Sequence, residues 1–401
     1  MKQLNRINYF HGRRPRFSVL FGTGTNAPSH SLVALLDMEV VNNNFYEADT
    51  FQVRAVLSAQ KAPHNGAAWW LSQPEIMVSI TVGTEPSGSV QGSGTTLIVG
   101  RVDDVVVDPV ADEIILSGRD LTGLLIDSRT SGDAMQQYQN STASQIVEGL
   151  LAPFSSWFSG NNIQPTTQQV GHYAGGNFLY LFRNRSVWDV IVWLAQTNVG
   201  SGGSPDPFVA YVDGFSLNFG PAPTPTGYFL IEWSPSASTS KTAYPMANVT
   251  HLDIAHNLTL AKDVSVTVMG FNPAIGRYSV TASGKHAQGH TGGGSFSQSL
   301  YSSVGYQHFV FVQNGITPIQ AQQMAQAKAK ALSQHEYILR VTMPGDPTLD
   351  PTQIVRFKSP LLPNNEMDFW VNAVTWRLNE SKGFEMELWL KNHPTGQQVV
   401  L

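Results

Sequence analysis

The chain has 401 residues, and its 24 Lys and Arg against 29 Asp and Glu give a formal net charge of −5. Charged residues make up 13% of the sequence and cysteine is absent, whereas soluble domains carry about 25% charged residues. These figures exclude disulfide scaffolds, cysteine-based zinc or iron–sulfur sites and thiol catalysis. They also argue against sequence-directed nucleic-acid binding, which needs a basic face. No apolar run approaches the ~18 residues of a membrane-spanning helix, so we expect no stable membrane insertion.

The low charge has two readings. A weakly charged surface suits a subunit that is covered by its neighbours in a permanent assembly, because free monomers stay soluble by displaying charge. It also suits a secreted or polysaccharide-binding β protein. The N-terminus is basic and lacks the apolar core of a signal peptide, which favours synthesis in a cytoplasm.

The first part of the chain has the pattern of β-strands. Apolar and polar residues alternate over Thr50–Ser58 and Ile76–Val82. Thr95–Val107 and Glu113–Ser117 predict a hairpin, because residues 108–112 between them include the Pro and Asp of a turn.

The middle of the chain mixes both patterns. Thr142–Phe154 has a helical stripe, with Thr142 and Gln145 in a capping box. Ser186–Gln196 predicts a second helix, with Ser186 as its N-cap. Short strands are expected at Phe178–Phe182 and Ala210–Phe219.

The last third is again mostly β. One long helix is predicted over Thr317–Glu336, and the Gly-, Ser- and His-rich residues 284–305 predict a loop. The strands expected here are Asp263–Gly270, Tyr337–Met343, Gln353–Lys358, Asp368–Leu378 and Phe384–Lys391.

A weak internal duplication accompanies these patterns. The hairpins Leu97–Gly118 and Phe369–Leu390 have the same order of apolar strand, polar turn and Glu-led strand. An alternating strand precedes each of them, and we take Thr50–Ser58 and Asp263–Gly270 as these strands. The fold class predicted is therefore mainly β with an α+β insertion, containing two similar β-barrel domains. The expected parts are an N-terminal arm 1–30, a first barrel 31–128, an α+β domain 129–240, and a second barrel 241–401 with a helical and Gly-rich insertion 276–336.

A search for chemistry finds no catalytic, cofactor-binding or metal site. His286 and His290 lie in a Gly-rich run without a nearby carboxylate, so a solvated loop is the simpler reading. Asp103 and Asp104 are adjacent in a strand and point to opposite faces, so they do not form a glycosidase pair. We expect one to face solvent and one to accept local hydrogen bonds. Tryptophans such as those of the Trp69–Trp70 pair predict core packing more than a sugar platform.

One segment is more specific. Glu113–Arg129 reads as a strand that ends in Gly118, Arg119, Asp120 and Leu121, followed by Thr-Gly-Leu-Leu and then Asp-Ser. It resembles the baseplate hub proteins of bacteriophage tails, of the late control protein D type, which are related to the hub domains of type VI secretion spikes. The segments that follow match in order over roughly residues 31–395. They are Asn140–Val147, Arg185–Ala195, Ala210–Leu217, Met343–Pro347 and the terminal hairpin.

The resemblance implies a structural role without a cofactor. Such hubs are homotrimers whose two barrels per chain form a ring of six, joining a sixfold tail tube or tube-adaptor protein to a threefold central spike protein. The tape measure protein is a further implied partner, and DNA transits the lumen without specific binding. In this reading Gly118, Arg119, Asp120 and Leu121 are a structural motif. The alternatives are a carbohydrate- or receptor-binding tail module and, less well supported, a peptidoglycan hydrolase.

Overall fold

The computed structural model describes most of the chain. The described residues are 2–3, 15–25, 27–84, 94–131, 135, 137–138, 141–167, 184–197, 208–234, 249–257, 263–272, 275–284, 306–313, 317–333, 337–362, 365–379 and 381–392. Within them, no helix is both long and apolar enough to cross a membrane.

The first β unit, residues 15–120, is built from strands that place alternate side chains in a core. In β5, for example, Phe51, Val53 and Ala55 are buried while the residues between them face outward. Helix α1 adds the buried Trp70. The elements are β2 (Pro15–Thr23), β3 (His30–Leu32), β4 (Leu35–Asn43), β5 (Thr50–Val56), α1 (Ala67–Ser72), β6 (Ile76–Thr84), β7 (Thr95–Asp108) and β8 (Glu113–Asp120).

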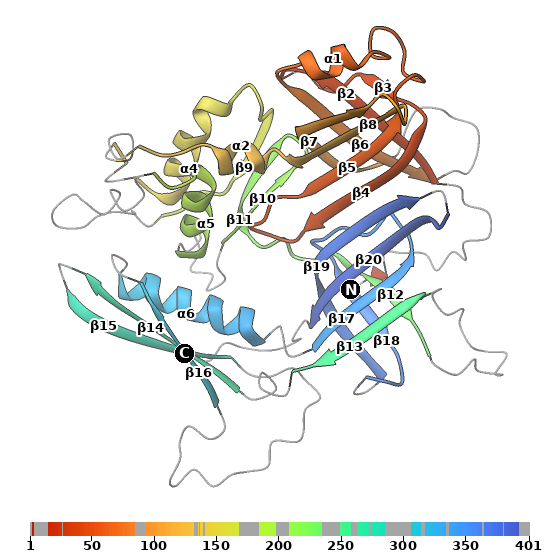
Figure 1. Ribbon diagram of the computed structural model, residues 1–401. Helices are drawn as coiled ribbons and strands as arrows, with labels where there is room; N and C mark the ends of the chain where they lie inside the picture. Colours follow the sequence, from red (N-terminus) through yellow and green to blue (C-terminus); the bar gives the residue numbers. More distant parts are fainter. Residues whose placement is uncertain are drawn as a thin grey trace.

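The second β unit has six strands of its own. They are β12 (Gly227–Glu232), β13 (His251–His256), β17 (Tyr337–Pro344), β18 (Ile354–Lys358), β19 (Glu366–Asn379) and β20 (Gly383–Asn392). Strand β4 pairs antiparallel with β19, so both units belong to one 14-stranded sheet that also includes β1 (Lys2–Gln3) (Figure 1). One apolar cluster runs through both units, with Val40 and Phe51 from the first and Trp376 and Leu388 from the second.

The α+β unit, residues 122–221, follows the first β unit. Its strands form a separate sheet in the order β10-β11-β9, and its helices share an apolar core with this sheet. The predicted capping box is present, because Thr142 accepts from the Gln145 N–H and the Gln145 side chain accepts from the Thr142 N–H. The elements are α2 (Thr122–Asp127), α4 (Ala143–Leu151), η1 (Ala152–Phe154), β9 (Gly160–Ile163), α5 (Val187–Thr197), β10 (Phe208–Asp213) and β11 (Ser216–Pro221).

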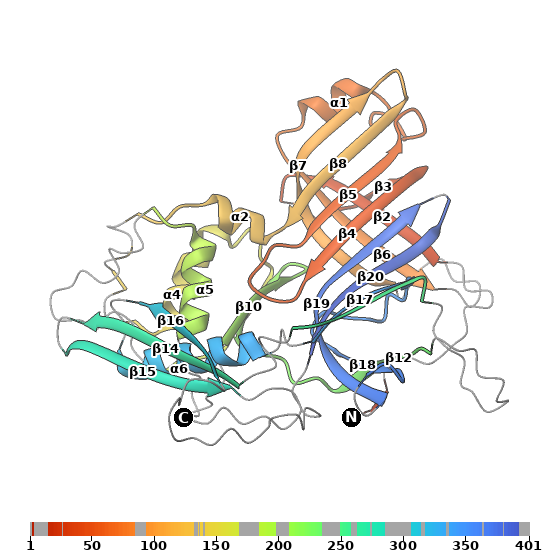
Figure 2. The ribbon, with the colours of Figure 1, turned by 60° about the horizontal axis from the view of Figure 1, so that its bottom comes forward.

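The inserted unit, residues 263–333, separates β13 from β17 in the chain. Helix α6 covers one face of a three-stranded sheet (Figure 2). Its Ala321, Ala325 and Ala329 share a buried cluster with Val264 and Val266 of that sheet. The elements are β14 (Asp263–Asn272), β15 (Gly276–Gly284), β16 (Tyr306–Val312) and α6 (Pro318–Ser333).

The expectation of a mainly β fold with an α+β part is confirmed. Both predicted hairpins are present, as β7–β8 and β19–β20. The pairings among the described strands do not close the large sheet on itself. The predicted strand Phe178–Phe182, His286 and His290 lie outside the described residues, as does the predicted loop 284–305 after its first residue.

The structure differs from the sequence expectations at three places. Pro15–Thr23, within the expected arm 1–30, is strand β2 and pairs with β6 over its whole length. Strand β12, from the expected α+β segment 129–240, pairs with β18 of the second β unit. Strand β14, which we expected beside the second hairpin, pairs with β15 and β16, so the inserted unit begins well before residue 276. Alternation marks a strand and its buried face, but it does not specify the partner strand.

The duplication is present in the strand order. The first β unit has the order β4-β5-β8-β7-β6-β2, and the second has β13-β17-β20-β19-β18-β12. When the six strands of each series are numbered 1 to 6 along the chain, both units have the same spatial order, 2-3-6-5-4-1. The strand that corresponds to β5 is therefore β17. One pair differs in direction, because β2 and β6 are antiparallel whereas β12 and β18 are parallel.

Candidate functional site

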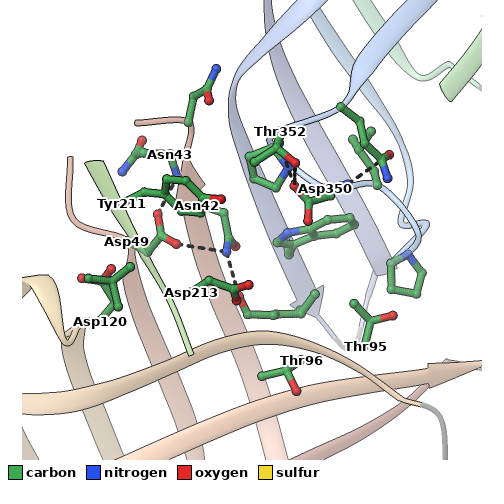
Figure 3. Close-up of a pocket in the computed structure, with 18 of the residues that line it drawn as sticks. Asn42, Asn43, Asp49, Thr95, Thr96, Asp120, Tyr211, Asp213, Asp350 and Thr352 are labelled. Carbon is green, nitrogen blue, oxygen red and sulfur yellow. Dashed lines mark hydrogen bonds between the residues drawn. The ribbon is translucent and has the colours of Figure 1, made fainter. Parts of the chain in front are cut away.

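A cavity of about 350 Å³ lies where the first β unit meets the α+β unit and the β17–β18 connection (Figure 3). Among the described residues, its lining contains no Lys, Arg or His. It does contain five carboxyl groups that come from four segments of the chain: Glu47, Asp49, Asp120, Asp213 and Asp350. The cavity therefore concentrates carboxyl groups.

Burial and repulsion from neighbouring carboxylates raise the pKa values of two of them, Asp49 and Asp213. For Asp49, burial and then the charge of Asp120 raise the pKa well above its ordinary range. The Asn43 N–H and the Asn42 side-chain amide partly oppose this by donating to Asp49, at 2.6 and 3.2 Å. Burial and the charge of Asp350 raise the pKa of Asp213 in the same way. No group of three or more His, Cys, Asp or Glu within the described ranges is arranged to hold a metal ion.

The predicted motif Gly118–Leu121 lies beside this cavity, at the end of β8. Gly118 and Gly100 allow the paired strands β8 and β7 to approach each other closely. A Cβ on Gly118 would collide with the Arg101 carbonyl oxygen, and one on Gly100 would collide with that of Arg119. Strand β7 has a bulge directly after this close approach, between Val102 and Asp104. A side chain at either position would therefore force the two strands apart.

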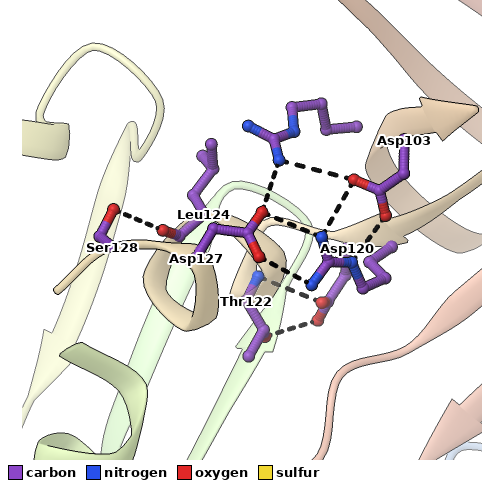
Figure 4. Close-up of polar contacts among 8 residues, drawn as sticks. Asp103, Asp120, Thr122, Leu124, Asp127 and Ser128 are labelled. Carbon is purple, nitrogen blue, oxygen red and sulfur yellow. Dashed lines mark hydrogen bonds and ion pairs between the residues drawn. The ribbon is translucent and has the colours of Figure 1, made fainter. Parts of the chain in front are cut away.

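Arg119 anchors an ion-pair cluster with Asp103 and Asp127, two carboxylates labelled in Figure 4. Its guanidinium binds Asp103 through Nε at 2.6 Å and a terminal nitrogen at 3.1 Å, and it binds Asp127 at 3.0 and 3.2 Å. Arg101 also donates to Asp127, at 2.9 Å. Hydrogen bonding from Arg119 lowers the pKa of Asp127. The cluster ties β7 and β8 to helix α2.

At Asp120 and Leu121 the chain leaves strand β8 and turns, and helix α2 begins at the next residue. The Asp120 carboxylate accepts hydrogen bonds from the Thr122 N–H at 3.1 Å and from its hydroxyl at 2.8 Å. Burial raises the pKa of Asp120 to about 7. Leu121 is fully buried in the core of the α+β unit, whereas Gly118 lies on the side of the first β unit. Four consecutive residues thus connect two hydrophobic cores.

The other residues considered from the sequence are exposed, form local hydrogen bonds or lie in the hydrophobic core. Asp104 is exposed and Asp103 accepts local hydrogen bonds, as predicted. Trp70 is 1% exposed and packs in the core beside Trp69, so this pair forms no open platform. His251 contacts Asp253 at 2.9 Å on strand β13.

Sequence reasoning missed the acidic cavity. Asp49 lies in the β4–β5 connection, Asp213 ends strand β10 and Asp350 lies in the β17–β18 connection, and no local pattern marks them. Only the pairing of β4 with β19 and the packing of the α+β unit bring them together, and neither is visible in a single sequence.

Comparisons with known proteins place the fold. No protein-family model and no curated protein sequence matches the chain. A tail protein from Neisseria meningitidis MC58 has the same fold, with a TM-score of 0.59 and 14% identity over 94% of this chain and 96% of that one. The 43 kDa tail protein of prophage MuSo2 from Shewanella oneidensis superposes with a TM-score of 0.60 and 13% identity, over 96% of this chain and all of that one. The chain therefore has the fold of tail proteins, in agreement with the resemblance of its Gly118–Leu121 segment.

Proposed function

We propose that this chain, which has the fold of tail proteins, is a baseplate hub subunit of a bacteriophage tail. Three copies form a homotrimer that adapts the sixfold tail tube, or a tube-adaptor protein, to the threefold central spike. The trimer encloses a channel in which the tape measure protein lies and through which DNA passes without specific binding. The protein is assembled in the cytoplasm of the host bacterium, takes its place in the virion tail, and catalyses no reaction.

The observation that carries this proposal is the repeated strand order. Each chain supplies two similar sheet units joined edge to edge through β4 and β19. Three such chains supply six similar units, so one ring presents sixfold geometry on one side and threefold geometry on the other.

The path of the first β unit supports a barrel. Strand β2 pairs with both β6 and β3, and only Val33 and Ala34 separate β3 from β4. Ala34 has a positive φ of 54°, which bends the chain at this point. We propose that this bend closes the unit into a barrel, with its strands continuing from β4 to β5 and back through β6 to β2.

The molar mass in solution tests the function. Light scattering coupled to size exclusion should give three times the chain mass for the purified protein, alone or with its spike partner. A monomer that persists over a wide concentration range and inside assembled tails would contradict the proposal. A zymogram on bacterial cell walls should show no clearing, and clearing would favour a hydrolase.

A further inference from the structure

The large sheet contains a continuous antiparallel path of eight strands with two open ends. The path is β13-β17-β20-β19-β4-β5-β8-β7. At one end, β13 pairs only with β17. At the other end, the Val102–Asp108 half of β7 pairs only with β8, because the pairing of β7 with β6 ends at Arg101, opposite Met77. In the part of the chain that the structure describes, no strand covers either outer edge.

The joint in the middle of this path shows how two units meet. Strand β4 pairs with β19 in antiparallel register from Asp37 opposite Asn379 to Asn43 opposite Ala373. Arg377 of β19 crosses the joint to bind Glu39 at 2.8 Å. The joint thus combines main-chain pairing with side-chain contacts on the outer face.

The strand order makes the two open ends equivalent to the two sides of that joint. Strand β13 holds the place of β4, and β7 holds the place of β19. The shapes agree as well. Strand β19 has a bulge where its pairing changes from β18 to β4, between Val371 and Ala373. Strand β7 has a bulge where its pairing with β6 ends, between Val102 and Asp104.

We propose that β13 of one copy of this chain pairs antiparallel with the Val102–Asp108 half of β7 of the next copy, repeating the β4–β19 joint between molecules. The contact joins unlike edges, so copies add head to tail, and such a contact forms a ring when the rotation closes. This inference rests on the proposed function and adds the interface by which its subunits meet.

The composition of the β7 edge fits a covered strand. Residues 102–108 include four valines and three aspartates but neither Lys nor Pro, two of the residues that natural proteins place on edges that stay open. Val106 is 54% exposed in the single chain. Matching the two hairpins at their turns puts Val106 in the place of Arg377, and matching β13 to β4 puts His251 in the place of Glu39. The two side chains then face each other across the new joint.

Cysteine cross-linking tests this pairing without background, because the chain has no cysteine of its own. Directly opposed strand positions have the Cβ separation that a disulfide needs. A chain carrying both His251→Cys and Val106→Cys should give, on mild oxidation, a ladder of covalent species that ends at the closed ring. A mixture of the two single variants should stop at covalent dimers, since each chain then has one reactive edge.

Two further variants bracket the register. Asp104→Cys and Asp108→Cys, each combined with His251→Cys, sample the neighbouring positions on the same face of β7. The control combines His251→Cys with Ile319→Cys on α6, where the side chain is 59% exposed but lies in the inserted unit. This control should give no ladder.

The outcomes separate the interface from the function. Under reducing conditions every variant should have the wild-type mass by light scattering. Failure of all three β7 pairs to cross-link in a protein that is still oligomeric overturns the proposed edge and leaves the hub function standing. A monomeric wild-type protein overturns both.

Discussion

At the scale of single residues, Arg119 holds the ion-pair cluster together by pairing with both Asp103 and Asp127. Its side chain is 28% exposed, and its guanidinium makes two-pronged hydrogen bonds with carboxylates on β7 and on α2. Planar guanidinium–carboxylate pairs of this kind are stronger than single surface ion pairs, because the geometry is fixed in both directions. Arg119 therefore holds the α+β unit against the first β unit.

Replacing Arg119 by Ala should lower the free energy of unfolding by about 1–2 kcal/mol, since Asp103 and Asp127 lose their main partner. Arg54→Ala is the matched control, because Arg54 also pairs with two carboxylates but is 40% exposed. Its loss should cost less than about 1 kcal/mol. Urea denaturation of both variants decides, and equal losses would contradict the role given to Arg119.

Asp120 makes stability depend on pH. Burial raises its pKa from 3.8 to about 7, so the folded state holds the proton more tightly than the unfolded state. The stability that this provides is complete below about pH 4 and is lost as the pH rises through 7. Asp120→Asn should therefore flatten the decline in stability between pH 4 and 8 by more than about 1 kcal/mol, because one pKa unit corresponds to about 1.4 kcal/mol.

The contrasting variant is Asp127→Asn. Arg119 lowers the pKa of Asp127, so this carboxylate contributes stability above its ordinary pKa that is lost as the pH falls. Removing it should leave the decline toward pH 8 intact and should weaken the protein most at neutral pH. Thermal unfolding at several pH values distinguishes the two behaviours. An unchanged profile in the Asp120 variant would show that the other cavity carboxyls dominate.

At the scale of elements, the close approach of the paired strands β7 and β8 depends on glycine. Gly118→Ala should destabilise the protein by at least about 2 kcal/mol, because the added methyl meets strand backbone that has no room to move. Gly83→Ala in β6 is the control, since its Cβ would have no neighbour closer than 3.9 Å. That change should stay within about 0.5 kcal/mol, as measured by chemical denaturation. A similar loss for both would contradict the close approach.

The elements also show what a sequence can predict. The two hairpins and helix α4 were predictable, because alternation and capping chemistry act over a few residues. Strand β2 was missed, since Arg14 and Arg16 flank its start and Gly22 interrupts its apolar run. Strand β14 was recognised but placed in the wrong sheet, because Val264, Val266 and Val268 would fit the core of either one.

The candidate site also has one part that the sequence could predict and one part that it could not. The Gly118–Leu121 segment was predictable because four consecutive residues share one turn at the end of a strand. The acidic cavity was not, because its carboxyl groups are distant in sequence and only long-range pairing brings them together.

At the scale of the whole molecule, the inserted unit is an addition to a repeated sheet. Its core is separate from the core that the two β units share, and α6 contacts the rest of the chain next to Trp193 of α5. In the first β unit, the corresponding strands β4 and β5 are joined by a short connection. His256 and Tyr337 are paired at the point where the inserted unit begins and ends.

Replacing residues 258–335 by a turn of roughly two to five residues should therefore leave the large sheet folded. Circular dichroism and a single cooperative thermal transition measure this. Removal of β20 is the matched control, because it takes the buried Met386, Leu388 and Leu390 from the shared core and should abolish the transition. Loss of cooperativity in the first variant would show that the inserted unit is required for folding.

The β4–β19 joint has a consequence for how the chain folds during synthesis. Glu39 and Arg377, which meet across it, are 338 positions apart. At bacterial and eukaryotic translation rates the ribosome needs on the order of tens of seconds to make the intervening chain. The first β unit is complete during that interval, while the edge of β4 has no partner. Such an edge recruits other nascent chains, so a lower expression level or a holding chaperone, each of which leaves fewer open edges to meet, should raise the yield of native protein.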